Sequence, residues 1–210
     1  MSLNAWITFS LAYLITTISP GPNVLLVIHN SLKYGSPSAL VTISGNLLSQ
    51  LIVVVLVACG VGTTIAALPE FFLVAKIVGA AYLIFLGFRQ IFSTRNMKTA
   101  PMLVENKVQT ITSKIGIFRQ AFFVSSSNPK TLIFLSAFMP QFVDPHRPLI
   151  VQFSVMYVTI ASTVVLVHLF YSASATQLKQ TVRNIRTLKL IKYLGGSIFV
   201  LLGAKLLSAK

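Results

Sequence analysis

Long apolar stretches alternate with short polar segments along the whole chain. Six of these stretches reach the roughly 20 residues that a helix needs to cross the hydrocarbon core of a bilayer. They cover residues 3–28, 38–68, 71–92, 115–142, 148–177 and 188–208. Because little chain is left for a soluble domain, the pattern predicts an all-α integral membrane protein in which residues 1–210 form one domain with six transmembrane helices.

Two of the six stretches contain residues that break helices. The first contains Ser19-Pro20-Gly21-Pro22-Asn23, and the fourth contains Asn128-Pro129-Lys130. Proline removes a backbone donor and glycine relaxes the backbone, so both helices are expected to stop and restart at these points. Irregular backbone at membrane depth survives only where protein or a water-filled cavity satisfies it. Both breaks therefore predict a site.

An internal repeat relates the two halves of the chain. The pattern Lys76-x-x-Gly79 followed by Leu86-Gly87 recurs 116 residues later as Lys192-x-x-Gly195 followed by Leu202-Gly203. Three stretches separate corresponding elements, so the halves would be inverted relative to each other, as in many secondary transporters. We expect residues 1–93 and 115–210 to form two inverted three-helix repeats joined by a cytoplasmic loop at 94–114. Chance similarity between glycine-bearing helices is the other explanation.

The formal net charge of +14 resides mostly in the short segments between the stretches. With six spans, one side receives Lys33, the six Lys/Arg residues of 89–119 and the five of 179–192. The positive-inside rule makes that side cytoplasmic and places both termini on the periplasmic side. Basic residues distributed in this way do not form a soluble nucleic-acid surface, so the expected partner is the lipid bilayer and not a nucleic acid.

Acidic residues are limited to three, namely Glu70, Glu105 and Asp144. All are expected in loops, and Glu70 falls in the turn that Gly60, Gly62 and Pro69 predict after the second stretch. Without carboxylates in the membrane, metal-dependent and two-carboxylate mechanisms lack their reacting groups. The sequence therefore predicts no enzyme activity, no metal and no cofactor.

Candidate substrate-binding residues lie at the two breaks and on the second stretch. They are Pro20, Gly21, Pro22, Asn23, Asn128, Pro129, Lys130 and Gln50. N–H groups freed at a break suit a carboxylate and exposed carbonyls suit an ammonium, so the expected ligand is a zwitterion. Four of these residues also have possible structural roles that involve no ligand. Lys130 could extend to the cytoplasmic surface, the two asparagines could serve only as helix caps, and Gln50 could serve only in packing between helices.

His168 on the fifth stretch is a candidate for proton coupling, since histidine changes its charge near neutral pH. A packed or interfacial histidine is the competing interpretation. A chain of six helices is also small for a complete alternating-access transporter, which favours a homodimer.

The two break motifs, together with Pro140-Gln141-Phe142-Val143 and the segment from Gly79 to Gly87, resemble the LysE/RhtB family of bacterial amino-acid exporters over essentially the whole chain. The resemblance implies a small inner-membrane protein that exports amino acids or close derivatives in exchange for protons. Similar members handle threonine, homoserine, leucine, lysine, arginine or cysteine-pathway metabolites.

The chain departs from that family at two places. Many members carry an acidic residue where this chain has Ser49-Gln50, and some carry another where it has Ser162 to Val165. Proton coupling would then depend on His168, Lys130 or the substrate amine, unless transport is facilitated diffusion. A neutral amino acid of the threonine, homoserine or leucine type is expected, because a second substrate ammonium would lack a counter-charge. The alternative is a non-transporting membrane subunit or assembly factor that binds partner helices.

Overall fold

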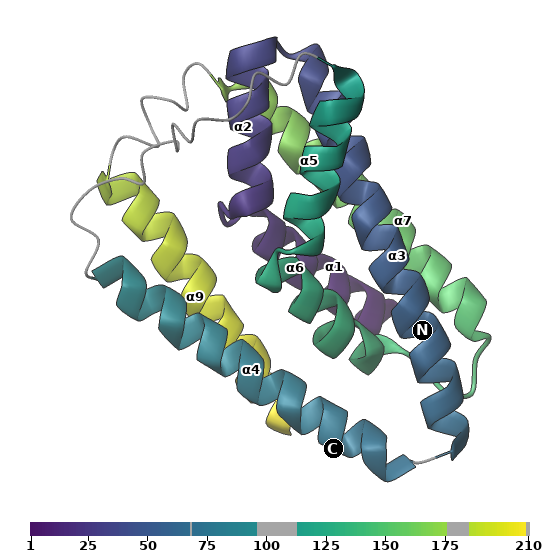
Figure 1. Cartoon of the computed structure of the whole chain (residues 1–210). Helices are drawn as coiled ribbons and strands as arrows, with labels where there is room; N and C mark the ends of the chain where they lie inside the picture. Colours follow the sequence, from purple (N-terminus) through teal and green to yellow (C-terminus); the bar gives the residue numbers. More distant parts are fainter. Residues whose placement is uncertain (68, 96–112, 176–184, 209–210) are drawn as a thin grey trace.

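The computed structural model describes residues 1–67, 69–95, 113–175 and 185–208, and these residues are helical with no strand. The elements are α1 (Leu3–Ile18), α2 (Pro22–Tyr34), α3 (Pro37–Ala67), α4 (Pro69–Arg95), α5 (Lys114–Ser126), α6 (Pro129–Ile133), the π-helical turn η1 (Phe134–Phe138), the 3-10 turn η2 (Met139–Phe142), α7 (Leu149–Ala173) and α9 (Ile185–Ser208) (Figure 1). Residues 96–112, which include Glu105 and most of the expected linker loop, lie outside the described residues.

Both expected helix breaks are confirmed. In the first stretch α1 ends at Ile18, α2 begins at Pro22, and the two helices are bent by 52°. In the fourth stretch α5 ends at Ser126 and α6 begins at Pro129. Each proline occupies the first turn of the new helix, where its missing N–H would have had no partner in any case.

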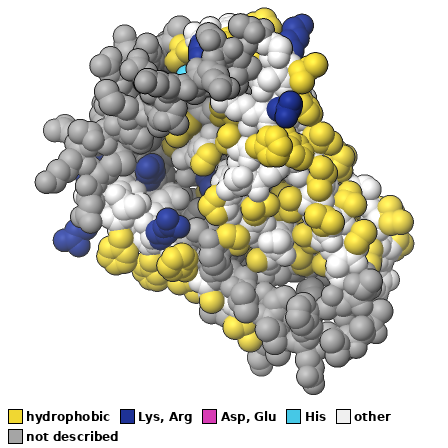
Figure 2. Space-filling view, in the orientation of Figure 1, with side chains coloured by type: hydrophobic (Ala, Val, Ile, Leu, Met, Phe, Trp, Pro, Cys, Tyr) yellow, Lys and Arg dark blue, Asp and Glu magenta, His cyan; other side chains and the backbone are white. Residues whose placement is uncertain are grey.

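Two helices among the described residues are long and apolar enough to cross a membrane, Pro37–Val61 and Leu149–Ala173. The bent pair α1 and α2 makes a third span if it is counted as one. Figure 2 shows hydrophobic side chains spread over the part of the surface where α3 lies. This arrangement fits a helical protein in lipid, and the assignment of six spans in two repeats stays a prediction.

The turn after the second stretch differs from the expectation. Gly60 and Gly62 do not end the helix, because α3 continues through both glycines to Ala67. The next helix begins at Pro69, so Glu70 belongs to the first turn of α4 and not to a loop. In a membrane, an intact backbone ladder outweighs the weak helix propensity of glycine, because an unpaired backbone group finds no water there.

Glycines bring α4 and α9 into close contact along the length that Figure 1 shows side by side. A Cβ added at Gly87 would lie 2.6 Å from the carbonyl oxygen of Gly196, and one added at Gly203 would lie 2.7 Å from that of Ala80. Residues that are early in α4 thus meet residues that are late in α9, so the helices are antiparallel. Such close backbone approach is how membrane helices associate without a hydrophobic driving force.

A side-chain amide hydrogen-bonds the α4–α9 pair to the first break. Gln90 Nε2 donates to the carbonyl of Lys192 at 2.7 Å and to the hydroxyl of Ser19 at 3.3 Å. Ser19 is the C-cap residue of α1. This glutamine therefore connects α4, α9 and the end of α1.

The remaining helices enclose an apolar core. Its fully buried side chains include Phe9 on α1, Phe134 and Phe138 on η1, and Met156 and Ile160 on α7. The two rings of η1 lie 4.7 Å apart between centroids, and Phe134 also contacts Phe9. This cluster holds the second half of the fourth stretch against α1, so the two broken stretches are brought together.

Candidate functional site

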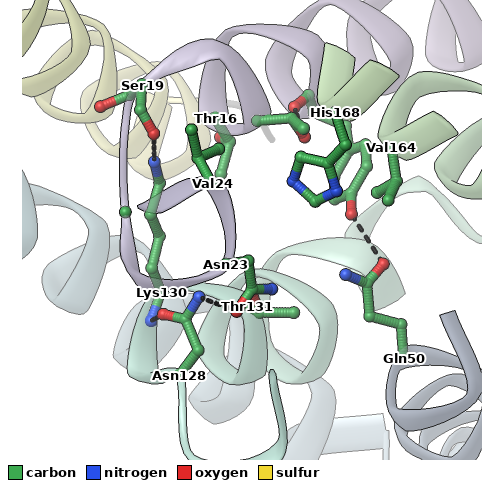
Figure 3. A pocket seen from close by; sticks show the side chains of 13 residues that line it. Thr16, Ser19, Asn23, Val24, Gln50, Asn128, Lys130, Thr131, Val164 and His168 are labelled. Carbon is green, nitrogen blue, oxygen red and sulfur yellow. Dashed lines mark hydrogen bonds between the residues drawn. The ribbon is translucent and has the colours of Figure 1, made fainter. Parts of the chain in front are cut away.

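A small cavity lies where the two breaks meet, with walls from α1, α2, α3, α6 and α7. Its volume is about 30 Å³. Since a water molecule needs roughly 10–15 Å³ of such space, the cavity has room for about two waters. Figure 3 shows Lys130, Asn128, Asn23 and His168 arranged around this space.

The two breaks are joined by a chain of side-chain hydrogen bonds. Asn128 Nδ2 donates to Asn23 Oδ1 at 3.1 Å (Figure 3). Asn23 Nδ2 in turn donates to the Ser125 hydroxyl at 3.3 Å. The same Asn128 caps α6, because its Oδ1 accepts from the backbone N–H of Lys130 at 3.2 Å. Both asparagines are buried. Capping and contact across the breaks are thus made by the same amide.

The carbonyl end of α1 is satisfied by side chains instead of by backbone. In an unbroken helix the Ile18 carbonyl would accept from residue 22, but Pro22 has no N–H. The Tyr171 hydroxyl of α7 donates to it at 2.7 Å. Partners from a neighbouring helix are how a proline break is tolerated in a membrane.

The carbonyl of Ser19 faces the ammonium of Lys130. Lys130 Nζ donates to this oxygen at 2.8 Å (Figure 3). A cation at the C-terminal end of a helix is favoured by the helix dipole and by the exposed carbonyls of the last turn. The side chain therefore points to the break in the first stretch.

The opposite wall carries Gln50 and His168. Gln50 Oε1 accepts from the Tyr13 hydroxyl at 2.9 Å, and both residues are buried. His168 is 2% exposed, and its Nδ1 has no hydrogen-bond partner among the described residues. A buried polar atom without a partner is uncommon in a protein, so this nitrogen is a candidate for contact with a ligand.

Sequence reasoning found about half of this lining. The cavity is lined by Gly21, Asn23, Gln50, Asn128, Lys130 and His168 from the expected set. Pro20, Pro22 and Pro129 are not among its lining residues, and they act by breaking the helices. Seven further lining residues were not anticipated: Tyr13, Thr16, Thr17, Ser19, Val24, Thr131 and Val164. The first three could have been found, because their spacing places polar groups on one helical face just before the break.

The lining offers one cation, amides and hydroxyls, but no carboxylate. Across the described residues, no three metal-ligating side chains come together. Such a set can hydrogen-bond a small polar molecule and can neutralise one negative charge.

Comparison with known proteins shows the family of this chain. A family model described as "LysE type translocator" matches residues 14–210. The chain is 30% identical over 210 residues to the homoserine/homoserine lactone efflux protein of Salmonella typhimurium, covering 100% of this chain and 99% of that protein. It is also 30% identical to an uncharacterized membrane protein of Vibrio cholerae over the full length of both chains.

A third relative is the leucine efflux protein of Salmonella choleraesuis, which is 29% identical over 169 residues and is matched over 80% of this chain and 76% of that protein. No solved structure matches. The resemblance that the break motifs indicated is confirmed. This chain belongs to the family of LysE type translocators.

Proposed function

We propose that this protein exports a small neutral amino acid, or a derivative of the homoserine or leucine type, across the bacterial inner membrane. The observation that carries the proposal is the pair of helix breaks that meet at a buried polar cavity and hydrogen-bond to each other. Discontinuous helices at mid-membrane are the usual substrate site of secondary transporters. The names of the two efflux relatives support amino-acid export.

The cavity offers partners for both ends of an amino-acid zwitterion. The first turn of α2 has no side-chain cap, and its N–H groups are proposed to bind a substrate carboxylate together with the Lys130 ammonium, which in this structure donates to the Ser19 carbonyl. The Ser19 carbonyl and the amide oxygen of Asn23 are acceptors for the substrate ammonium. A dibasic substrate would bring a second positive charge with no carboxylate among the lining residues to meet it. These features support a neutral side chain.

We further propose that residues 1–93 and 115–210 form inverted repeats of three spans each, joined by the loop at 94–114. The packing of α4 on α9 supports this arrangement. Gly87 meets Gly196, and Gly203 meets Ala80. The offset of 116 residues relates Gly87 to Gly203 and Ala80 to Gly196, so the two contacts are the same contact with the helices exchanged, as a two-fold axis between α4 and α9 requires. In this proposal both termini are periplasmic, Lys33 is cytoplasmic, and two chains form a homodimer.

Export of the substrate is expected to require a wider cavity than the one observed. The present space holds about two waters, so an amino acid is admitted only when the broken helices move apart. The breaks at residues 19–21 and 127–128 are the proposed hinges for that motion, since the helical backbone ladder is interrupted at both.

Purified protein in liposomes tests the function directly. We expect loaded radiolabelled homoserine or leucine to cross the membrane at least about tenfold faster than through protein-free liposomes, a rate ratio equivalent to about 1.4 kcal/mol. Lysine should cross no faster than in the control. A growth-inhibition panel of amino acids and analogues against overexpressing cells would identify the substrate class. If no amino acid moves, the protein is better described as a non-transporting subunit.

His168 is proposed to take part in proton coupling, because it lines the cavity and the described part of the chain offers its Nδ1 no hydrogen-bond partner. Lys130 and Tyr13 are the other titratable side chains around the same cavity. We expect His168→Gln to flatten the pH dependence of efflux while retaining transport at the wild-type optimum within about threefold, less than the tenfold of 1.4 kcal/mol. The profile is obtained by measuring efflux in buffers from about pH 5.5 to about pH 8.5, which bracket the usual pKa of histidine. A profile that matches wild type removes His168 from the coupling mechanism.

A further inference from the structure

A buried polar face runs along the first half of α3 toward the cavity. Ser38, Thr42, Asn46, Ser49 and Gln50 are spaced so that they share one side of the helix. All five are buried, and Thr42 and Asn46 are fully inaccessible. The face begins at the turn between α2 and α3 and ends at Gln50, which lines the cavity. Twelve residues of helix cover about 18 Å.

Hydrogen bonds connect both ends of this face to neighbouring helices. Near the turn, Asn30 Nδ2 of α2 donates to the Thr42 hydroxyl at 3.0 Å. Near the cavity, the Ser125 hydroxyl of α5 is placed 3.5 Å from the carbonyl of Asn46 and accepts from Asn23. The face therefore lies between α2 and α5, and it continues the hydrogen-bonded chain that joins the two breaks.

The middle of this face is left without hydrogen bonds. Neither the Nδ2 nor the Oδ1 of Asn46 has a partner among the described residues, and the Oδ1 of Asn30 also lacks one. An asparagine that serves only to stabilise a buried contact would be hydrogen-bonded, because an unmade bond leaves the desolvation penalty uncompensated. Buried amide atoms of this kind favour a state in which water or a polar ligand satisfies them.

We propose that the substrate passes along this polar face between the α2–α3 turn and the cavity, and that this part of the pathway is closed in the present structure. Asn46 is then an intermediate binding site for the zwitterion on that pathway. When α2 and α5 separate from α3, water enters, and the amide of Asn46 hydrogen-bonds the carboxylate and ammonium of the passing amino acid. The inference rests on the proposed export function for the identity of the ligand. The existence of a water-accessible route is tested separately.

Cysteine accessibility provides that separate test. Cys59, the single cysteine of the sequence, is replaced by serine, and Asn46→Cys is compared with Ile43→Cys. Ile43 is a matched control because it lies on the same helix, is 3% exposed and belongs to the apolar core. Inside-out membrane vesicles and intact spheroplasts are treated with a membrane-impermeant methanethiosulfonate, with no amino acid added.

We expect Asn46→Cys to react at least about tenfold faster than Ile43→Cys in inside-out vesicles, and to react slowly in spheroplasts. Equal rates for the two cysteines, or faster labelling of Asn46→Cys from the spheroplast side, overturn the route. Because no substrate is present, efficient labelling in a protein that exports nothing would sustain the route and reject the export function. Normal export with equal labelling of the two cysteines would sustain the export function and reject the route.

A second pair of variants distinguishes a route from a structural role. Asn46→Leu removes two unpaired polar atoms and favours the closed state, so we expect export to fall about tenfold while the melting temperature in detergent stays equal or rises. Ser31→Ala is the control, because the Ser31 hydroxyl is buried but bonded to Val27 and Ser172. We expect that variant to melt lower and to export normally. A lower melting temperature for Asn46→Leu with normal export would assign Asn46 a structural role.

Discussion

Replacing Lys130 with alanine is expected to abolish efflux while the protein still inserts into the membrane. The change removes the one cation of the cavity lining and its 2.8 Å hydrogen bond to the Ser19 carbonyl. A hydrogen bond to a charged group contributes about 1.5–3 kcal/mol, which corresponds to a loss of roughly 10- to 150-fold in rate if it is made in the transport cycle. Uptake of radiolabelled substrate into inside-out vesicles measures this loss.

Lys33→Ala is the matched control for that experiment. Lys33 is an exposed lysine at the end of α2 and makes its ring contact with neighbouring Tyr34, away from the cavity. Its removal changes the net charge by the same amount, and it should leave the rate of efflux unchanged. Wild-type transport by Lys130→Ala, at equal amounts of inserted protein, would remove Lys130 from the substrate site.

Gly45→Ala is expected to destabilise the protein and to displace the second break. A Cβ added at Gly45 would overlap the carbonyl oxygen of Phe118 and lie 2.9 Å from the Cβ of Ala121. Because backbone cannot rotate away as a side chain does, α5 must shift as a whole, and with it Ser125 and Asn128. Overpacking of this kind costs about 1–3 kcal/mol. A thermal melt in detergent and an efflux assay should both show the loss.

Gly60→Ala on the same helix is the control. A Cβ added at Gly60 meets no atom within 4 Å from elsewhere in the described residues, so alanine is accommodated there. Alanine also has a higher helix propensity than glycine by about 1 kcal/mol, which predicts equal or slightly greater stability. If both variants melt alike, the contact between α3 and α5 does not hold the break in place.

The breaks were predictable because their cause is local. Proline at positions 22 and 129 removes a backbone donor whatever surrounds it, and the structure places the new helices at those residues. The helical course of Gly60 and Gly62 was not predictable in this way. A glycine turn signal is a weak local preference, and the requirement for paired backbone in lipid overrides it.

The partners at the breaks depended on tertiary packing and could not be found from sequence alone. Tyr171 is 153 residues from the carbonyl that it satisfies, and Lys130 is 111 residues from Ser19. The amide and cation at the fourth stretch were recognisable as polar groups at a break, so Asn128 and Lys130 were predicted. Ser19 was assigned to the break motif but not to the site, because its contribution is a backbone carbonyl, which any residue could provide.

The position of Ser19 has a mechanical consequence. Its carbonyl holds Lys130, which belongs to the second half of the chain, while its hydroxyl accepts from Gln90, which is also anchored on Lys192 of α9. One residue at the tip of α1 is thus tied to both the cavity and the α4–α9 pair. A rigid-body displacement of that pair would therefore act on the same short peptide segment that holds the Lys130 ammonium.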